Sequence, residues 1–235
     1  MTQEFSHLPS TIPYFLKEQI RESIVDGTFR PGQPLRGQEM ERRYGTSRAS
    51  IREALLLLEQ SGLVSHRPRH GFLVTLYTEK EIRDQYLLRA ELESYGMRCL
   101  SEAGDLAPLL EELQACRVRM THAYEAQNAR KYLAEIHQFF DAIVDYRDNE
   151  SLRMALNRLN EISEPLRYNL LSRRLVHSRS LEYTQNMIDA LRARDFSYAA
   201  ELKHEHVLLN LPYVIEAYRA AECNEELANQ SELGE

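Results

Sequence analysis

The chain has few cysteines and no long apolar segment. Its three cysteines, Cys99, Cys116 and Cys223, are far apart and show no CxxC spacing of the kind that binds zinc or exchanges disulfides. No run of about 18 apolar residues is present, and the start MTQEFSHLPS has neither the basic nor the apolar region of a signal peptide. These absences predict a cytoplasmic protein with no membrane-spanning helix.

Glycine is also scarce and unevenly placed. Six of the nine glycines lie in residues 1–76, and the low content of the rest favours helices, because glycine is costly inside them. The charge is uneven as well. Residues 1–76 carry 10 Lys and Arg against 8 Asp and Glu, which is +2, and the rest carries 19 against 28, which is −9. A mildly basic N-terminal third on an acidic body is expected of a DNA-binding domain joined to a domain that does not bind DNA.

The sequence signatures of common enzymes are missing too. The chain has no glycine-rich phosphate loop, no nucleophile elbow and no cluster of metal ligands at a familiar spacing. We therefore expect that the protein is not an enzyme.

Three helices and a hairpin are predicted in the first 76 residues. Apolar residues at helical spacing predict a helix over residues 12–26, which ends at Gly27, and a short second helix over residues 36–44. A third helix follows Thr46 and Ser47, which are natural N-caps, and residues 63–75 read as two short strands around a basic turn. Helix, helix, turn, helix and hairpin in this order predict a winged helix-turn-helix.

The third helix carries the donors that a major groove requires. Arg48 and Arg52 lie about 40° apart beside the buried stripe, and Ser47 and Ser50 share the first turn with Arg48. An arginine can donate two hydrogen bonds to one guanine, while the serines contact phosphates or base edges. A single exposed arginine is more often only solvated, but the capped helix, the arginine pair and the hairpin favour DNA binding together. At the hairpin tip, Arg69, His70 and Gly71 are the predicted contacts to the adjacent groove.

From the capping box of Thr78 and Glu81 onward, the pattern is helical. Six helices are predicted, at about residues 79–102, 107–127, 130–146, 150–172, 179–193 and 196–220. The expected fold is therefore mainly α, a winged helix-turn-helix followed by an all-α helical bundle. The expected domains are a DNA-binding domain at 1–76, an all-helical effector-binding and dimerisation domain at 77–222, and a disordered tail at 223–235.

Three segments, PGQPL, GTSRASIREALLLLEQSGLV and RPRHGFLV, resemble the GntR family of bacterial regulators. The second part resembles the fatty-acid-regulator-like branch, whose helical ligand-binding domain is called FCD, through YLLRAELE and MIDALRARDFSYAAELKHEH. The resemblance implies a homodimer, formed largely through the helical domain, that binds a two-fold related operator in double-stranded DNA, most simply as a repressor. It also implies DNA contacts at Ser47, Arg48, Ser50, Arg52, His70 and Gly71, and at Gln38 with Arg36 nearby.

Many relatives hold a divalent metal in the helical domain, and this chain departs from their pattern. The implied ligand positions fall on Ile136, Phe140, Gln185 and His206, of which only His206 is a strong ligand. His137 and His204 are poor replacements, since His204 points about 200° away from His206 on a helix. No metal and no other cofactor is therefore expected.

A pocket without metal would be apolar with a few polar anchors. The resemblance places Arg89, Gln185 and His206 at this pocket, and Arg89 has the chemistry to hold a carboxylate of a small organic-acid effector. An intrahelical pair of Arg89 with Glu93 is an equally good interpretation, and Arg167 and Tyr86 are weaker candidates. The alternative is a helical domain that only dimerises or binds another protein, with no small ligand.

Overall fold

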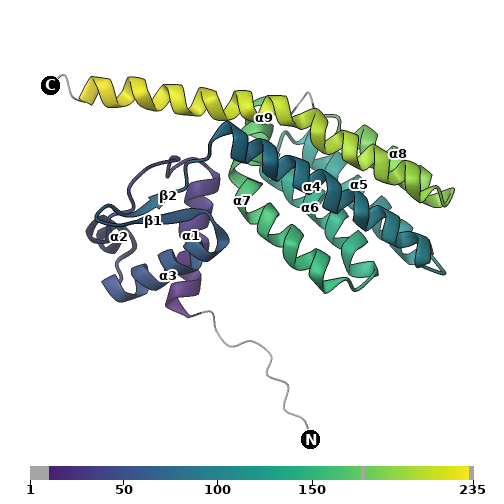
Figure 1. The fold of residues 1–235 in the computed structure, drawn as a ribbon, viewed down its shortest axis with the longest axis horizontal. Helices are drawn as coiled ribbons and strands as arrows, with labels where there is room; N and C mark the ends of the chain where they lie inside the picture. Colours follow the sequence, from purple (N-terminus) through teal and green to yellow (C-terminus); the bar gives the residue numbers. More distant parts are fainter. Residues whose placement is uncertain (1–10, 176–177, 233–235) are drawn as a thin grey trace, which may run out of the picture. The chain divides into compact units, whose positions relative to one another are not determined.

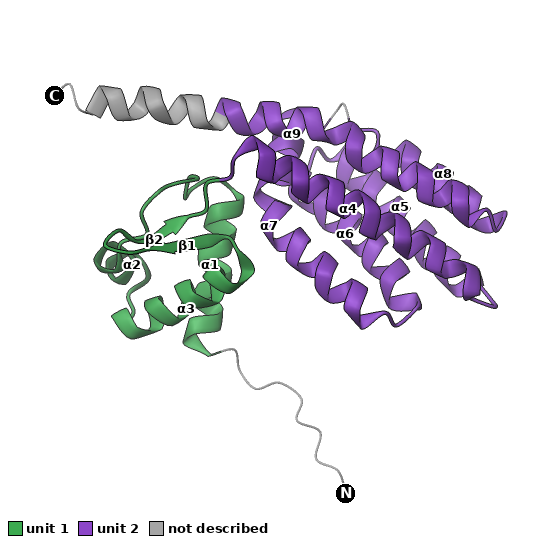
Figure 2. Ribbon diagram, viewed as in Figure 1, with its two compact units in different colours: residues 1–76 green, residues 77–235 purple. Residues whose placement is uncertain are grey.

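The computed structural model describes residues 11–175 and 178–232. The chain divides into two compact units, residues 1–76 and residues 77–235 (Figure 2). The division falls where the sequence changes from a mixed pattern with turns to a helical one.

Three helices form most of the first unit: α1 (Ile12–Val25), α2 (Gly37–Tyr44) and α3 (Arg48–Ser61) (Figure 1). Gly45 ends α2 in the left-handed conformation, with a φ of 60°, which glycine adopts without strain. Ser47 begins α3 as its N-cap, because its hydroxyl accepts a hydrogen bond from the backbone N–H of Ser50 at 3.2 Å. The short turn between the two caps sets the direction in which α3 leaves α2.

A two-stranded antiparallel hairpin follows α3. Strand β1 (Val64–Arg67) pairs with β2 (Gly71–Val74), with Val64 opposite Val74. The segment before α2 lies along β2, because the N–H of Leu35 donates to the carbonyl of Phe72 at 2.8 Å. The predicted winged helix-turn-helix is confirmed. Its core comprises Leu16, Ile20, Ile24, Phe29, Leu35, Met40, Ile51, Ala54, Leu55, Leu58, Leu63, Val64 and Val74.

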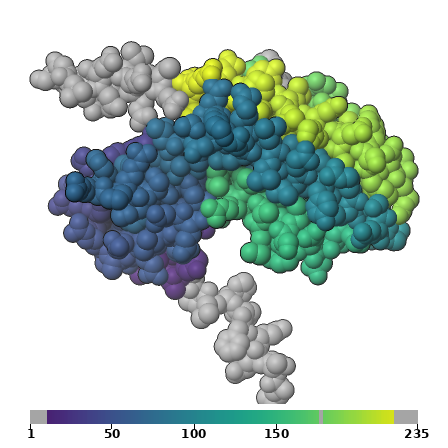
Figure 3. Space-filling model, viewed as in Figure 1, coloured from purple at the N-terminus to yellow at the C-terminus, as the bar shows by residue number. Residues whose placement is uncertain are grey.

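The second unit is helical throughout its described residues. Its helices are α4 (Glu79–Cys99), α5 (Ala107–Glu125), α6 (Ala129–Tyr146), α7 (Glu150–Arg174), α8 (Ser180–Arg192) and α9 (Phe196–Glu232), with a 3₁₀ turn at Leu100–Glu102. Thr78 and Glu81 form the capping box at the start of α4, and Asn128 and Asn149 cap α6 and α7. Helices α4 and α9 pack side by side and form one continuous surface of this unit (Figure 3). The predicted all-α architecture is therefore confirmed.

The last helix is longer than the sequence suggests. The helical backbone of α9 continues to Glu232, through most of the segment 223–235 for which a disordered tail is expected, and residues 233–235 lie outside the described residues. Ala, Glu and Leu are frequent in this segment and favour a helix that has already begun. None of the helices within the described ranges is both long and apolar enough to cross a membrane.

Candidate nucleic-acid interface and ligand cavity

The start of α3 presents donors to solvent. The side chain of Arg48 is 80% exposed, and Arg52 on the next turn is exposed as well. Ser47 and Ser50 are joined through their hydroxyls at 3.0 Å, so the cap also orients both serines. The apolar stripe of the same helix, which includes Ile51, is buried in the core. The helix therefore turns its arginines away from its own unit.

Helix α2 adds two exposed polar residues before α3. Arg36 is the N-cap residue of α2, and its side chain is 73% exposed; Gln38 is exposed one turn into the helix. The start of α3 approaches α2 through Arg48, whose Nε lies 3.9 Å from Oε1 of Glu41. Such a long, exposed contact holds Arg48 only weakly, and leaves it available to a stronger anion such as a phosphate.

The hairpin tip is basic and sharply turned. Arg69 adopts a φ of 69° and Gly71 a φ of 77°, so two residues of this short loop occupy the left-handed region. Arg69 and His70 are exposed, and Gly71 carries no side chain to keep a phosphate away from its backbone. The tip therefore offers two exposed polar side chains and an open backbone to the groove beside the one that α3 enters.

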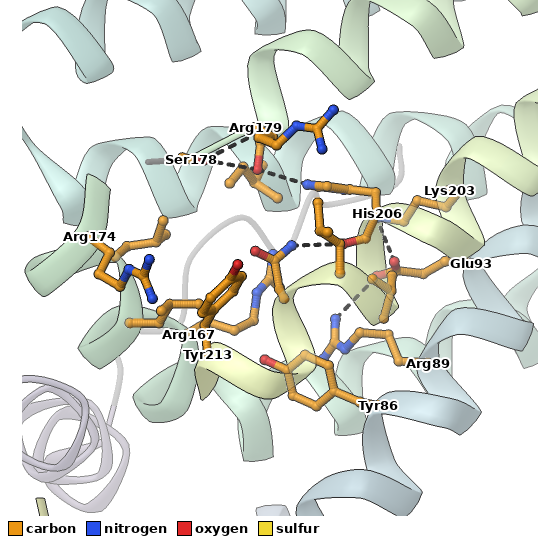
Figure 4. A pocket seen from close by; sticks show the side chains of 17 residues that line it. Tyr86, Arg89, Glu93, Arg167, Arg174, Ser178, Arg179, Lys203, His206 and Tyr213 are labelled. Atoms are coloured by element: carbon orange, nitrogen blue, oxygen red, sulfur yellow. Dashed lines mark hydrogen bonds and ion pairs between the residues drawn. The ribbon is translucent and has the colours of Figure 1, made fainter. Parts of the chain in front are cut away.

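A cavity of about 320 Å³ lies inside the second unit, among α4, α6, α7, α8 and α9 (Figure 4). Its apolar wall is formed by Ile136, Leu170, Leu171, Val207 and Leu209. Its polar lining is richer in cations than in anions. The polar and charged lining residues are Tyr86, Arg89, Glu93, Arg167, Arg174, Ser178, Arg179, Ser180, Lys203, His206, Asn210 and Tyr213.

The guanidinium of Arg89 is fully occupied within the protein. It is 3% exposed, and it donates to Oε1 of Glu93 at 3.2 Å and to Oδ1 of Asn160 at 2.6 Å. It also donates to the carbonyl of Leu159 at 2.7 Å and to the hydroxyl of Ser163 at 2.5 Å. These four acceptors fix the side chain between α4 and α7. Arg89 thus forms the pair with Glu93 that the sequence offers as one interpretation, and few of its donors remain for a ligand.

Glu93 joins Arg89 to a second buried cation. Its Oε2 lies 2.6 Å from Nζ of Lys203, and the Lys203 side chain is only 2% exposed. The ammonium also lies 3.1 Å from the centre of the Phe140 ring, within the range of a cation–π contact. Burial lowers the pKa of Lys203 to about 7, while Lys203 and Arg89 together overcome burial and lower the pKa of Glu93 to about 2. One carboxylate therefore serves two cations.

Arg167 has a different environment from Arg89. Its Nη1 donates to Nε2 of His137 at 2.6 Å, and since a guanidinium has no acceptor, this His137 nitrogen carries no proton. Among the described residues, no carboxylate forms an ion pair with Arg167, although Glu93 and Glu164 act on it from farther away. Burial, followed by the positive charge of Arg89, lowers the pKa of Arg167 to about 10. Arg167 is thus the cavity cation that most lacks an anion.

A chain of hydroxyl groups fixes the imidazole of His206. Ser178 contacts the Tyr132 hydroxyl at 3.0 Å and donates to the Ser180 hydroxyl at 3.2 Å, which lies 2.9 Å from Nε2 of His206. Since Ser180 accepts from Ser178, its own proton is directed to Nε2. Burial, followed by the charge of Lys203, lowers the pKa of His206 to about 3, so the neutral ring carries its proton on Nδ1. This buried Nδ1 has no hydrogen-bond partner among the described side chains and backbone.

Gln185 lies elsewhere. The sequence places it at the pocket with Arg89 and His206, but among the described residues that line the cavity Gln185 is absent, and its amide donates to the Asp189 carboxylate at 3.0 Å. One helical turn separates these two residues, so a local contact takes the side chain. His204, on the exposed side of α9, lies 3.4 Å from Glu91.

The residues at the implied metal positions do not fit a metal ion. Nε2 of His206 is taken by Ser180, and the ring at position 140 faces the Lys203 ammonium, whose charge repels a cation. Within the described part of the chain, no three His, Cys, Asp or Glu side chains are gathered as ligands. Ile136 contributes only apolar surface to the cavity.

Lys203 is the cavity residue that sequence reasoning missed. It has a signal in hindsight, because Ala199, Lys203 and His206 recur at the spacing of the buried stripe of α9. A lysine on an apolar stripe is unusual, and when buried it needs a paired anion. Arg174 and Arg179 at the cavity were also missed. They lie near the α7–α8 connection and are partly exposed, with side chains 39% and 52% accessible.

Comparison with known proteins supports both units separately. Residues 15–74 match the model of the bacterial regulatory proteins of the gntR family, and residues 84–209 match that of the FCD domain. The chain is 27% identical over 213 residues to the HTH-type transcriptional repressor GlaR of Escherichia coli, covering 84% of this chain and 93% of GlaR. It is 24% identical to the gluconate operon transcriptional repressor of Bacillus subtilis, over 80% of this chain and 79% of that one.

The fold is also shared with solved structures. A GntR-type regulator from Rhodococcus superposes with a TM-score of 0.71 at 21% identity, covering 88% of this chain and 98% of that one. The FCD match alone spans more than half of the chain, and the relatives are transcription regulators, not enzymes. The chain therefore belongs to the GntR family of DNA-binding transcription regulators, in the fatty-acid-regulator-like branch that carries an FCD domain.

Proposed function

We propose that this chain is a homodimeric transcription repressor whose affinity for operator DNA is controlled by a small organic acid bound in the helical unit. The repressor assignment follows the two relatives, GlaR and the gluconate operon regulator, which are both named repressors. Two copies would place two α3 helices in successive major grooves of a two-fold related site. The acid would act by binding the DNA-competent and DNA-incompetent states with different affinity.

The observation that carries the effector is the cavity with Arg167 in its lining. A helical unit that only dimerises has no need of about 320 Å³ of internal space lined by several cations. Arg167 would hold the carboxylate, because Arg89 is already occupied by four acceptors. His206 would add a hydrogen bond from Nδ1. We further propose that binding requires no metal and that the other predicted anchor, Gln185, takes no part.

The test is ligand-induced stabilisation of the full chain, with a matched pair of variants. A panel of small carboxylic acids is screened by thermal shift with EDTA present, and acids that stabilise the protein are tested for release of operator DNA. Arg167→Gln should abolish the shift, whereas Arg158→Gln, an exposed arginine on the same helix, should leave it unchanged. If no acid stabilises the protein, the alternative of a helical unit that only dimerises or binds another protein is favoured.

A further inference from the structure

The buried charges that line the cavity do not balance. Arg89, Arg167 and Lys203 supply three positive charges in its interior, and Glu93 supplies the single negative charge among them. Arg174 and Arg179 also line the cavity, but each is partly exposed and has its own acidic neighbour, Glu216 at 3.7 Å and Glu182 at 3.0 Å. The interior therefore holds two positive charges in excess.

The protein itself offers no further anion for these two charges. The Glu93 carboxylate is shared between Arg89 and Lys203, and the only hydrogen-bond partner of Arg167 in the described chain is the neutral nitrogen of His137. Lys203 has three donors, of which one reaches Glu93 while the Phe140 ring covers the ammonium from another side. Buried charge without a counter-charge is costly, so an anion from solution would be stabilised here.

The neutral groups beside these cations have the same preference. Nδ1 of His206 is a buried donor without a partner, and the hydroxyl of Tyr86, which is 3% exposed, likewise has none among the described residues. Arginine and lysine donate only, and the His206 nitrogen donates because Ser180 occupies the other one. A ligand that fits this set is therefore rich in acceptors and poor in donors.

We propose that the ligand is a small dianion whose two negative charges are neutralised by Arg167 and Lys203, most simply a dicarboxylate with a short apolar body. This inference rests on the proposed function, because it concerns the charge of the same effector. The wall formed by Ile136, Leu170 and Val207 faces the body of the ligand, and the cavity volume equals that of about ten water molecules. Lys203 thus supplies from within the chain a cation that a dianion requires.

Pairs of acids with equal chain length test the charge directly. Succinate is compared with butyrate, glutarate with pentanoate and adipate with hexanoate, by isothermal titration of the full chain at pH 7, constant ionic strength and with EDTA. We expect the best dianion to bind at least about tenfold more tightly than its monoanion, since a hydrogen bond to a charged group contributes about this factor or more. Inorganic phosphate is a further arm, and tighter binding of phosphate than of every dicarboxylate overturns the dicarboxylate.

Two variants test which residues recognise the charge. Lys203→Met and Arg167→Gln each leave one excess positive charge, so each should reduce the preference for the dianion to about twofold or less, by the same arithmetic. Arg158→Gln on the surface of α7 is the control and should keep the full preference. Lys203→Met is checked for folding by circular dichroism, and Arg167→Gln stands in if it fails to fold. A preference that persists in the folded variants overturns the assignment.

The two proposals fail in different ways. If wild-type protein binds both members of a pair equally, the dianion is overturned while the organic-acid effector stands. If no acid and no phosphate binds, both are overturned.

Discussion

The arginines of the two units have opposite environments. In the first unit, Arg48 is 80% exposed and its nearest acidic atom is 3.9 Å away, so its donors are available. In the second unit, Arg89 is 3% exposed and donates to four acceptors from two helices. The same side chain therefore binds an external partner in one unit and stabilises the fold in the other. Burial and the number of acceptors distinguish the two roles.

The largest effect should follow from removing the buried carboxylate. Glu93→Gln leaves Arg89 and Lys203 without their common anion, and breaking a buried ion pair costs about 3–5 kcal/mol of unfolding free energy. Urea denaturation of the full chain measures this loss. Glu79→Gln is the matched control, because Glu79 lies on the same helix and also contacts two cations, Arg83 and Arg219, but at the surface. Equal losses in both variants would contradict the role assigned to burial.

The next effect concerns DNA. Arg48→Ala and Arg52→Ala should each weaken operator binding by about 1–3 kcal/mol and relax base preference, as expected when a side chain that reads a base edge is removed. Mobility shifts with the operator and with scrambled DNA measure both properties. The melting temperature should barely change, since both arginines are exposed. Arg158→Ala removes the same charge from the helical unit and is the control; unchanged binding by both α3 variants would exclude the proposed docking.

These contrasts also show what the sequence could predict. The winged helix-turn-helix follows from local signals: Gly45 ends one helix, Ser47 begins the next and the Ile51 stripe identifies the buried face. The exposure of Arg48 follows from the same periodicity. All of these signals lie within about one or two helical turns, where backbone geometry relates sequence directly to structure.

The cavity depends on contacts that no local pattern contains. The pair of Arg89 with Glu93 is visible as an i, i+4 spacing, but the acceptors from Leu159, Asn160 and Ser163 come from about 70 residues away in α7. Without them, Arg89 looks free to bind a ligand. Gln185 shows the converse, because its contact with Asp189 takes it away from the cavity to which the resemblance assigns it.

A pH effect of intermediate size separates the two units further. His206 has a pKa of about 3 in the folded protein, against about 6.5 when unfolded, because burial and its charged neighbours Lys203, Arg167 and Arg179 outweigh Glu93. Between these values only the unfolded state takes up the proton, so stability falls as pH decreases from 6.5 towards 3, by up to about 1.4 kcal/mol per pH unit.

Denaturation at pH 7.5, 6.5 and 5.5 measures this slope. His206→Gln should be less stable at pH 7.5 but lose less on acidification than the wild type. His204→Gln removes an exposed histidine from the same helix and should keep the wild-type slope. A wild-type slope in His206→Gln would show that another group takes up the proton.

The smallest effect concerns the N-cap of α3, where folding and DNA binding use the same residue. Ser47→Ala removes the acceptor for the Ser50 N–H and should cost about 1 kcal/mol of unfolding free energy. Ser47→Asn and Ser47→Asp both cap a helix well, so both should restore most of this stability. They differ only in charge, and the carboxylate of Ser47→Asp would face the phosphates. Asn should therefore retain much of the operator affinity and Asp should lose it, with a steeper dependence on salt for the protein that keeps more phosphate contacts. If both restored proteins bind DNA equally well, Ser47 only caps the helix, and the contrast between exposed donors that read DNA and buried donors that support the fold does not extend to this position.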